Sequence, residues 1–278
     1  MRVESAGIRL CADVADLRAR MGKIRWLSAI WAVNLGRMSW DEALADHYEE
    51  WSADMTADVA FYVELASRAE GPLVELAIGN GRVAIPVAQA TGQPVIGIDA
   101  SPRMLEQATI RAAEAGVRLD LSEADMRDLR LDQPAALIYC PFRAMLHLST
   151  WADRRRVFER VAASLRPGGR FAWNAFAFDH HIAARLDGTR QLRPVPHTIR
   201  YAVGDNRIDL VCDDGAVSSL WWATKNEWLG LLDVAGLELE ALHGGFGGEP
   251  FTEDSREYVF VARRAHASGL GLDNHSSA

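Results

Sequence analysis

The chain has 278 residues, of which 49% are hydrophobic and 24% are charged. This composition excludes a mainly disordered chain and fits one elaborated domain with a substantial core. The formal net charge of −8 gives no general attraction to phosphate backbones or anionic lipid, so we expect neither a nucleic-acid nor a membrane partner. Three widely separated cysteines fit neither a disulfide framework nor a zinc site, and we expect a cytoplasmic protein.

The N-terminal part shows helical periodicity. Apolar side chains at spacings of three and four predict an amphipathic helix over residues 17–38, and a second helical run covers residues 43–69. We therefore expect residues 1–71 to form an N-terminal helical cap. Packing of the first helix on the core, or on a second subunit in a homodimer, is favoured over a role as a lid on an active site.

From residue 72 short apolar strands alternate with helices, which is typical of βαβ units. The expected strands are 72–77, 94–99, 118–122, 135–140 and 170–177, and the expected helices are 82–90, 102–115 and 153–165. Two hairpin turns then separate strands at 198–203, 207–212 and 216–223. A helix at 225–235 and strands at 237–242 and 256–263 complete the pattern.

The fold class that this order predicts is α/β, with a doubly wound, mostly parallel seven-stranded sheet over residues 72–264. An antiparallel hairpin extension is expected at about residues 178–224. The tail at 265–278 is rich in small and polar residues and is expected to be disordered.

A glycine turn follows the first strand in the segment Glu75-Leu76-Ala77-Ile78-Gly79-Asn80-Gly81-Arg82. Glycines let the backbone approach a ligand closely, and the helix that follows presents unpaired N–H groups. Gly79, Gly81 and Ala84 also satisfy a relaxed dinucleotide fingerprint. An NAD-dependent oxidoreductase is therefore one alternative, although no Tyr-x-x-x-Lys pair is evident.

An acid, Asp99, ends the second strand 18 residues after Gly81, where its carboxylate can accept both hydroxyls of a ribose. The helix start Ser101-Pro102 follows it. Two more motifs come later, Glu123-Ala124-Asp125-Met126 and the turn Arg166-Pro167-Gly168-Gly169. In this order, over roughly residues 45–177, the motifs resemble those of class I S-adenosylmethionine-dependent methyltransferases.

The resemblance implies a Rossmann-like fold, with S-adenosylmethionine as cofactor and S-adenosylhomocysteine as product. It implies that Gly79 and Gly81 face the methionine part, that Asp99 holds the ribose, and that Asp125 meets the adenine amino group. Glu75 matches the acid that positions the cofactor's amino group, or is an acid satisfied by loop N–H groups. The full set of expected cofactor contacts is Tyr48, Glu75, Ala77, Gly79, Gly81, Arg82, Asp99, Ala100, Met104, Asp125, Met126 and Cys140.

Two departures from the family pattern matter. Ala77 replaces the first loop glycine, and Ala135-Ala136 stands where many relatives have an acid. The second departure leaves the acceptor site to the residues after the fourth strand. Among these His147 is the expected general base, because an imidazole takes up a proton near neutral pH, with a pKa near 6 to 7. A capping or cofactor-contacting role is the alternative for this histidine.

Other candidates lie further along the chain. Asp179, His180 and His181 form a second cluster that a metal could use, but solvated loop residues are favoured and no metal is expected. Core packing is the default for the nine tryptophans, although some of them could stack on a substrate. The expected substrate contacts are Arg143, Trp173, His197 and Trp222.

The function predicted from these residues is methyl transfer to a small polar acceptor. O-methylation of a sugar or natural-product hydroxyl is preferred, because an oxygen acceptor needs a base more than a neutral amine does. N-methylation of a small amine metabolite is the alternative. A non-catalytic, cofactor-binding or dimerising module is a third possibility.

Overall fold

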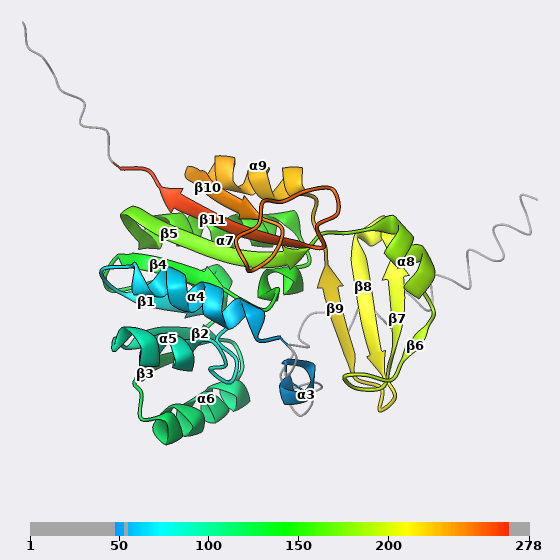
Figure 1. Ribbon diagram of the computed structural model, residues 1–278, viewed down its shortest axis with the longest axis horizontal. Coiled ribbons are helices and arrows are strands. Elements are labelled where there is room, and N and C mark those ends of the chain that lie inside the picture. Colours follow the sequence, from blue (N-terminus) through cyan, green and yellow to red (C-terminus); the bar gives the residue numbers. More distant parts are fainter. Residues whose placement is uncertain (1–47, 53–54, 267–278) are drawn as a thin grey trace, which may run out of the picture. The chain divides into compact units, whose positions relative to one another are not determined.

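The computed structural model describes residues 48–52 and 55–266, all of which belong to one unit, Trp40–Ala278. Two sheets form in it, sheet A and sheet B (Figure 1). The strands of sheet A are β1 (Leu73–Leu76), β2 (Val95–Asp99), β3 (Leu119–Glu123), β4 (Ala135–Cys140), β5 (Leu165–Phe176), β10 (Leu237–His243) and β11 (Glu257–Arg264). Those of sheet B are β6 (Arg190–Gln191), β7 (His197–Ala202), β8 (Arg207–Cys212) and β9 (Val217–Trp221).

Helices precede, follow or connect these strands. The α-helices are α3 (Tyr48–Ser52), α4 (Ala57–Ser67), α5 (Ala84–Thr91), α6 (Pro102–Ala115), α7 (Trp151–Ser164), α8 (His180–Leu186) and α9 (Lys225–Ala235). Short 3-10 turns are η1 (Met126–Asp128), η2 (Ala144–His147) and η3 (Val203–Asp205). No helix in the described ranges has the length and apolar character that a bilayer crossing needs.

Sheet A has the strand order β10-β11-β5-β4-β1-β2-β3. β1 to β5 run parallel, whereas β11 is antiparallel to both β5 and β10. The doubly wound, mostly parallel sheet that the sequence predicts is confirmed. Because the strand order reverses between β1 and β4, the carboxyl ends of these strands mark the place where such sheets bind ligands.

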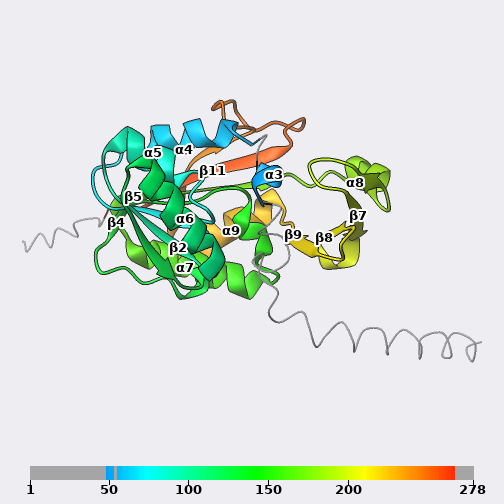
Figure 2. The same ribbon diagram turned by 90° about the horizontal axis from the view of Figure 1, so that it is seen from below.

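Helices cover both faces of sheet A, with α4, α5 and α6 on one face and α7 and α9 on the other (Figures 1 and 2). On the first face Phe61 and Val87 pack with Leu73. On the second, Phe158 and Trp228 pack in one core cluster. α4 therefore shares a core with β1, and this part of the expected cap is packed on the sheet.

Local capping chemistry fixes the helices whose bounds the sequence predicts best. Ser101 Oγ accepts the main-chain N–H of Met104 at 3.0 Å, Pro102 opens α6, and Gly116 ends it in the left-handed conformation. Thr224 and Glu227 form a capping box at the start of α9. These signals lie within a few residues of each helix end, so the sequence alone was sufficient to place them.

Other elements differ from expectation. The single helix expected at 43–69 is wrong, because Met55 and Thr56 are not helical. The helix α8 and the strand β6 were not predicted, although Asp179 caps α8 by accepting the main-chain N–H of His181 at 2.7 Å. The amphipathic helix expected at 17–38, and the tail beyond residue 266, lie outside the described residues.

Sheet B contains the predicted hairpins. β7, β8 and β9 pair antiparallel in sequence order. Ile199, Ile208 and Trp222 form a small core on one face of this sheet. An arginine of α7, Arg154, donates a hydrogen bond to the carbonyl of Trp221, which links sheet B to the helices of sheet A.

Candidate cofactor and acceptor sites

The glycine turn folds back on the carboxyl end of β2. Ala77, Gly79 and Gly81 all have left-handed φ values, of 53°, 56° and 80°. Glycine adopts this conformation without steric cost, whereas Ala77 adopts it at a cost of roughly 1 kcal/mol. The N–H of Gly79 donates to Asp99 Oδ2 at 2.8 Å, and a Cβ added to Gly79 would lie 3.5 Å from the Tyr48 hydroxyl. The turn thus lies against Asp99 and Tyr48, two further predicted cofactor contacts.

Main-chain donors fix the carboxylate of Asp99. Besides Gly79, the N–H of Ser101 donates to Oδ1 at 2.9 Å. A carboxylate offers about four lone-pair sites, so a ribose diol could bind the same two oxygens. The geometry therefore fits the role that the resemblance implies.

Glu75, in the middle of β1, is 1% exposed and its Oε2 has no hydrogen-bond partner within the described residues. Burial raises the pKa of this carboxyl well above 4.5, and the nearby Tyr139 hydroxyl and Arg82 oppose the shift. Both polar side-chain atoms of Asn80 are also buried and unpartnered within that part of the chain. Folded proteins rarely leave such groups unsatisfied, and an ammonium group would satisfy the carboxylate. The residues present therefore fit the amino-acid part of S-adenosylmethionine.

Arg82 has a partner that the sequence did not indicate. Its guanidinium donates to both carboxylate oxygens of Asp58, at 2.8 Å and 2.5 Å, and to the carbonyl of Met55 at 2.5 Å. Asp58 is 1% exposed. This buried ion pair anchors α4 to the glycine turn, and the contact of Arg82 with the cofactor stays a prediction.

The other expected cofactor contacts lie at two places. Tyr48 and Met104 form a small buried cluster with Phe142, whose ring centroid is 5.4 Å from that of Tyr48, while Ala100 is exposed. Asp125 accepts from Arg127 Nη2 at 2.6 Å and from the Arg127 main chain at 2.8 Å. Partial burial raises the pKa of Asp125, but these hydrogen bonds outweigh it and lower the pKa below 3.8.

Met126, beside Asp125, is half-buried against the core cluster of sheet A. Cys140 lies in that cluster with no exposed surface, and burial raises the pKa of its thiol. Because the side chain is fully buried, a contact of Cys140 with the cofactor would come from its main chain, and that contact stays a prediction. We call the group Glu75, Gly79 and Asp99 the cofactor edge.

Three of the expected substrate contacts are core residues instead. Trp173 is fully buried and stacks on Phe260, with ring centroids 4.6 Å apart. Trp222 is 3% exposed and stacks on Phe178 at 4.1 Å. His197 is 3% exposed, and its Nδ1 lies 2.6 Å from the carbonyl of Val195. The predicted substrate roles of Trp173, Trp222 and His197 are corrected, because hydrophobic burial decides their positions.

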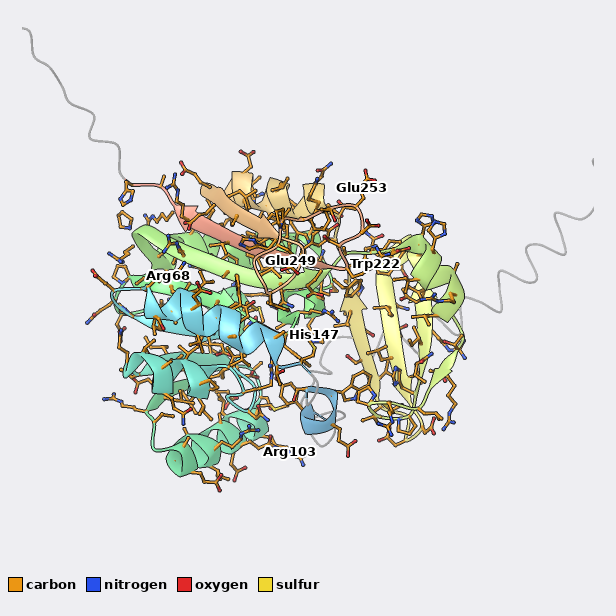
Figure 3. The ribbon with its side chains drawn as sticks, in the orientation of Figure 1. Arg68, Arg103, His147, Trp222, Glu249 and Glu253 are labelled. Atoms are coloured by element: carbon orange, nitrogen blue, oxygen red, sulfur yellow. The ribbon has the colours of Figure 1, made fainter. Side chains whose placement is uncertain are left out.

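His147 lies in η2, after β4 (Figure 3). Burial lowers the pKa of its imidazole to about 4, and a hydrogen bond with the main chain of Ser219 in β9 opposes the shift. The ring is therefore neutral at neutral pH, and this pKa lies below the value of 6 to 7 that the sequence led us to expect. A neutral imidazole that donates from one nitrogen carries a lone pair on the other, which a general base requires.

Arg143, the fourth expected substrate contact, pairs with Glu257 of β11, and Asn174 of β5 contacts both residues. Local motifs mark neither Asn174 nor Glu257, and the sequence analysis missed both. We call the group Arg143, His147, Asn174 and Glu257 the acceptor edge. Arg143 and His147 follow β4, Asn174 lies near the end of β5 and Glu257 opens β11. In the strand order β4 is next to β1, which carries Glu75.

The second cluster of polar residues is structural. Asp179 caps α8 and pairs with Arg256 at 3.2 Å, and the rings of His180 and His181 lie side by side at 3.9 Å. Within residues 48–52 and 55–266 no three histidine, cysteine or acidic side chains gather as a metal site would need.

Comparisons with known proteins agree with the fold. Residues 73–169 match the family described as a methyltransferase domain. The 27-O-demethylrifamycin SV methyltransferase of Amycolatopsis mediterranei (strain S699) is 32% identical over 152 residues, 54% of this chain and 54% of that protein, so the chain matches about half the length of this relative. The cypemycin N-terminal methyltransferase of Streptomyces sp is 24% identical over 218 residues, 69% of this chain and 82% of that protein.

Among solved structures, the CcbJ methyltransferase of Streptomyces caelestis has the same fold, with a TM-score of 0.68 and 24% identity over 82% of this chain and 98% of that one. Residues 73–169 therefore form a methyltransferase domain, and the sheet has the Rossmann-like order of the class I group that the motifs resemble. The matched domain and relatives indicate S-adenosylmethionine as the cofactor. The matched domain and the two relatives are methyltransferases, so the comparisons do not support the oxidoreductase alternative.

Proposed function

We propose that the chain transfers the methyl group of S-adenosylmethionine to a hydroxyl group of a small polar molecule of the natural-product type. N-methylation of a small amine is the second candidate. The observation that carries the proposal is the adjacency of the two edges: an unsatisfied buried acid and a fixed Asp99 on one side, and the neutral imidazole of His147 on the other.

S-adenosylmethionine, when bound, supplies a methyl group on a positively charged sulfur. The sulfur is the leaving group and needs no further activation. Glu75 would hold its amino group and Asp99 its ribose hydroxyls, with Tyr48 and Met104 close to the glycine turn. His147 would take the proton of the acceptor hydroxyl on the ring nitrogen that does not bond Ser219. The protein thus mainly aligns the acceptor and removes one proton.

The relatives support a natural-product acceptor and both possible acceptor atoms. One is named for a demethylrifamycin and the other for a peptide N-terminus. The neutral state of His147 favours the oxygen acceptor, because a neutral amine can attack without a base. The net charge of −8 supports a small molecule over nucleic acid or an anionic membrane as partner.

The test combines binding with turnover. Titration calorimetry should show that S-adenosylhomocysteine binds and NAD does not. Incubation with S-adenosylmethionine and a panel of hydroxyl and amine acceptors, including 27-O-demethylrifamycin SV, should yield a product heavier by one methyl group, identified by mass spectrometry. Methylation of amines alone would favour the second candidate, and binding of NAD alone would contradict both.

Two further proposals concern the protein in solution. A homodimer and a cytoplasmic location remain the sequence-based expectations. Sedimentation velocity over a range of concentrations would test the first, and fractionation of the source cells the second.

A further inference from the structure

The guanidinium of Arg143 is held in one orientation by a strand far away in the sequence. Its Nε lies 3.1 Å from each carboxylate oxygen of Glu257, and its Nη2 lies 2.6 Å from Oε2. The remaining nitrogen, Nη1, has no hydrogen-bond partner among the described residues. The side chain is 37% exposed, so one end of a fixed cation is available to a ligand.

Glu257 is itself fixed by a buried amide. Asn174, which has no exposed surface, donates from Nδ2 to Glu257 Oε1 at 2.6 Å. Its Oδ1 accepts from the Tyr62 hydroxyl at 3.2 Å and from the main-chain N–H of Arg143 at 3.3 Å. These two donors show that Oδ1 of Asn174 faces them, so Nδ2 faces Glu257. If the carboxylate of Glu257 turned away, the buried Nδ2 donor would lose its partner.

The backbone that carries Arg143 is strained. Phe142 and Arg143 have left-handed φ values of 55° and 60°, although neither is glycine. Such conformations persist only where surrounding contacts determine them, and they concentrate at ligand sites. The two hydrogen-bonded partners of Arg143 are contacts of this kind.

The location favours a role in acceptor binding. Arg143 follows β4, and Asn174 and Glu257 belong to β5 and β11, the next two strands of sheet A. β4 is also the neighbour of β1, which leads into the glycine turn. The guanidinium lies 5.9 Å from the ring centroid of Phe176, which supplies an apolar surface beside it.

We propose that Glu257 and Asn174 are positioning residues that present Nη1 of Arg143 to an uncharged oxygen of the methyl acceptor. This inference rests on the proposed function and specifies its substrate class. Because Glu257 already neutralises the guanidinium, the pair offers an N–H donor without net positive charge. A carboxylate or phosphate would meet Glu257 as well as Arg143, so the site selects acceptors that are neutral next to the reacting group.

Two probes of the same shape test the charge preference without turnover. Benzamide carries an uncharged oxygen and benzoate a charged one, and their binding is measured by calorimetry in saturating S-adenosylhomocysteine. The wild type should prefer benzamide, and Glu257→Gln should bind benzoate about tenfold more tightly than the wild type does, because the guanidinium loses its counter-charge. The double variant Glu257→Gln/Arg143→Met should lose this gain.

The proposal is overturned if Glu257→Gln leaves the preference unchanged, if the gain survives Arg143→Met, or if neither probe binds either protein. Should Glu257→Gln not fold, Arg143→Met alone must weaken benzamide binding about tenfold, and unchanged binding overturns the proposal. Arg118→Met, at an exposed position just before β3, is the matched control. Failure of the wild type to bind S-adenosylhomocysteine would instead count against the proposed function.

Discussion

The cofactor edge and the acceptor edge lie side by side in sheet A, but their contacts span very different distances along the chain. At the cofactor edge Asp99 meets the N–H groups of Gly79 and Ser101, which are 20 and 2 residues away. At the acceptor edge Glu257 meets Arg143 and Asn174, which are 114 and 83 residues away. One site is made by the main chain of a single βαβ unit, and the other by side chains that only the finished sheet brings together.

This difference has a functional consequence. Changes at the acceptor edge should alter turnover and leave cofactor affinity intact, whereas changes at the cofactor edge should alter cofactor affinity. Variants of His147 and Asp99 test that separation, and two stability measurements test the buried contacts that hold α4 and His147 in place.

The largest effect is expected for His147→Ala. Loss of a general base typically lowers kcat by about 10²–10⁴-fold, measured at saturating acceptor, while the affinity for S-adenosylhomocysteine should stay within a few-fold. His180→Ala, which removes an exposed histidine of α8, is the control and should leave kcat unchanged. Near-normal kcat in folded His147→Ala would remove this residue from the mechanism.

The next effect concerns the anchor between α4 and the glycine turn. Asp58→Ala should lower the free energy of unfolding by about 3 kcal/mol, because the buried guanidinium of Arg82 loses its counter-charge. Urea denaturation measures this loss. Asp120→Ala breaks an exposed pair with Arg118 and should cost less than about 1 kcal/mol. Equal costs for the two variants would show that the Asp58 pair is not effectively buried.

A smaller effect is expected at the ribose position. Asp99→Ala should weaken S-adenosylmethionine binding by about ten- to a hundredfold, since a charge-assisted contact is lost. Glu123→Ala, at the exposed end of the neighbouring strand β3, provides the control. Unchanged affinity in folded Asp99→Ala, measured by calorimetry, would contradict the assigned cofactor edge.

The smallest effect is a pH dependence of stability. The folded-state pKa of His147 is about 4, below its ordinary value of 6.5, so the folded protein disfavours the charged ring. Its contribution to stability is therefore present above pH 6.5 and is lost as the pH falls toward 4.

Comparison with His147→Gln isolates this contribution from other titrating groups. Between pH 7.5 and 4.5 the stability advantage of the wild type over the variant should shrink by roughly 1 kcal/mol, a value reduced for solvent screening of a half-buried ring. A difference that stays constant over this range would mean that the folded protein does not depress the pKa of His147.

The two edges also differ in how far the sequence predicted them. The glycine turn, Asp99 and the helix start at Ser101 were all identified from their spacing, because each depends on groups within one βαβ unit. At the acceptor edge the sequence predicted Arg143 and His147 but neither Glu257 nor Asn174. It also did not predict Tyr62, which donates to Asn174. No local pattern distinguishes Glu257 from the other acids of the chain.

The tryptophans also show that the sequence does not distinguish a ligand contact from a core residue. An aromatic ring near the end of a strand fits either a ligand or the core, and the sequence does not say which face of the finished sheet it meets. Trp173 and Phe260 stack because β11 pairs with β5. That pairing, and not the composition, removes Trp173 from the candidate site.

By itself the sequence determined the doubly wound sheet, the capped helices and the main-chain features of the cofactor edge. These follow from turn chemistry, capping and hydrophobic periodicity, which act over a few residues. The tertiary structure alone decided the Arg82–Asp58 anchor, the network of Arg143, Asn174 and Glu257, the lowered pKa of His147 and the burial of Trp173. Each of these depends on which strands and helices become neighbours, because burial and side-chain pairing exist only after the chain has folded.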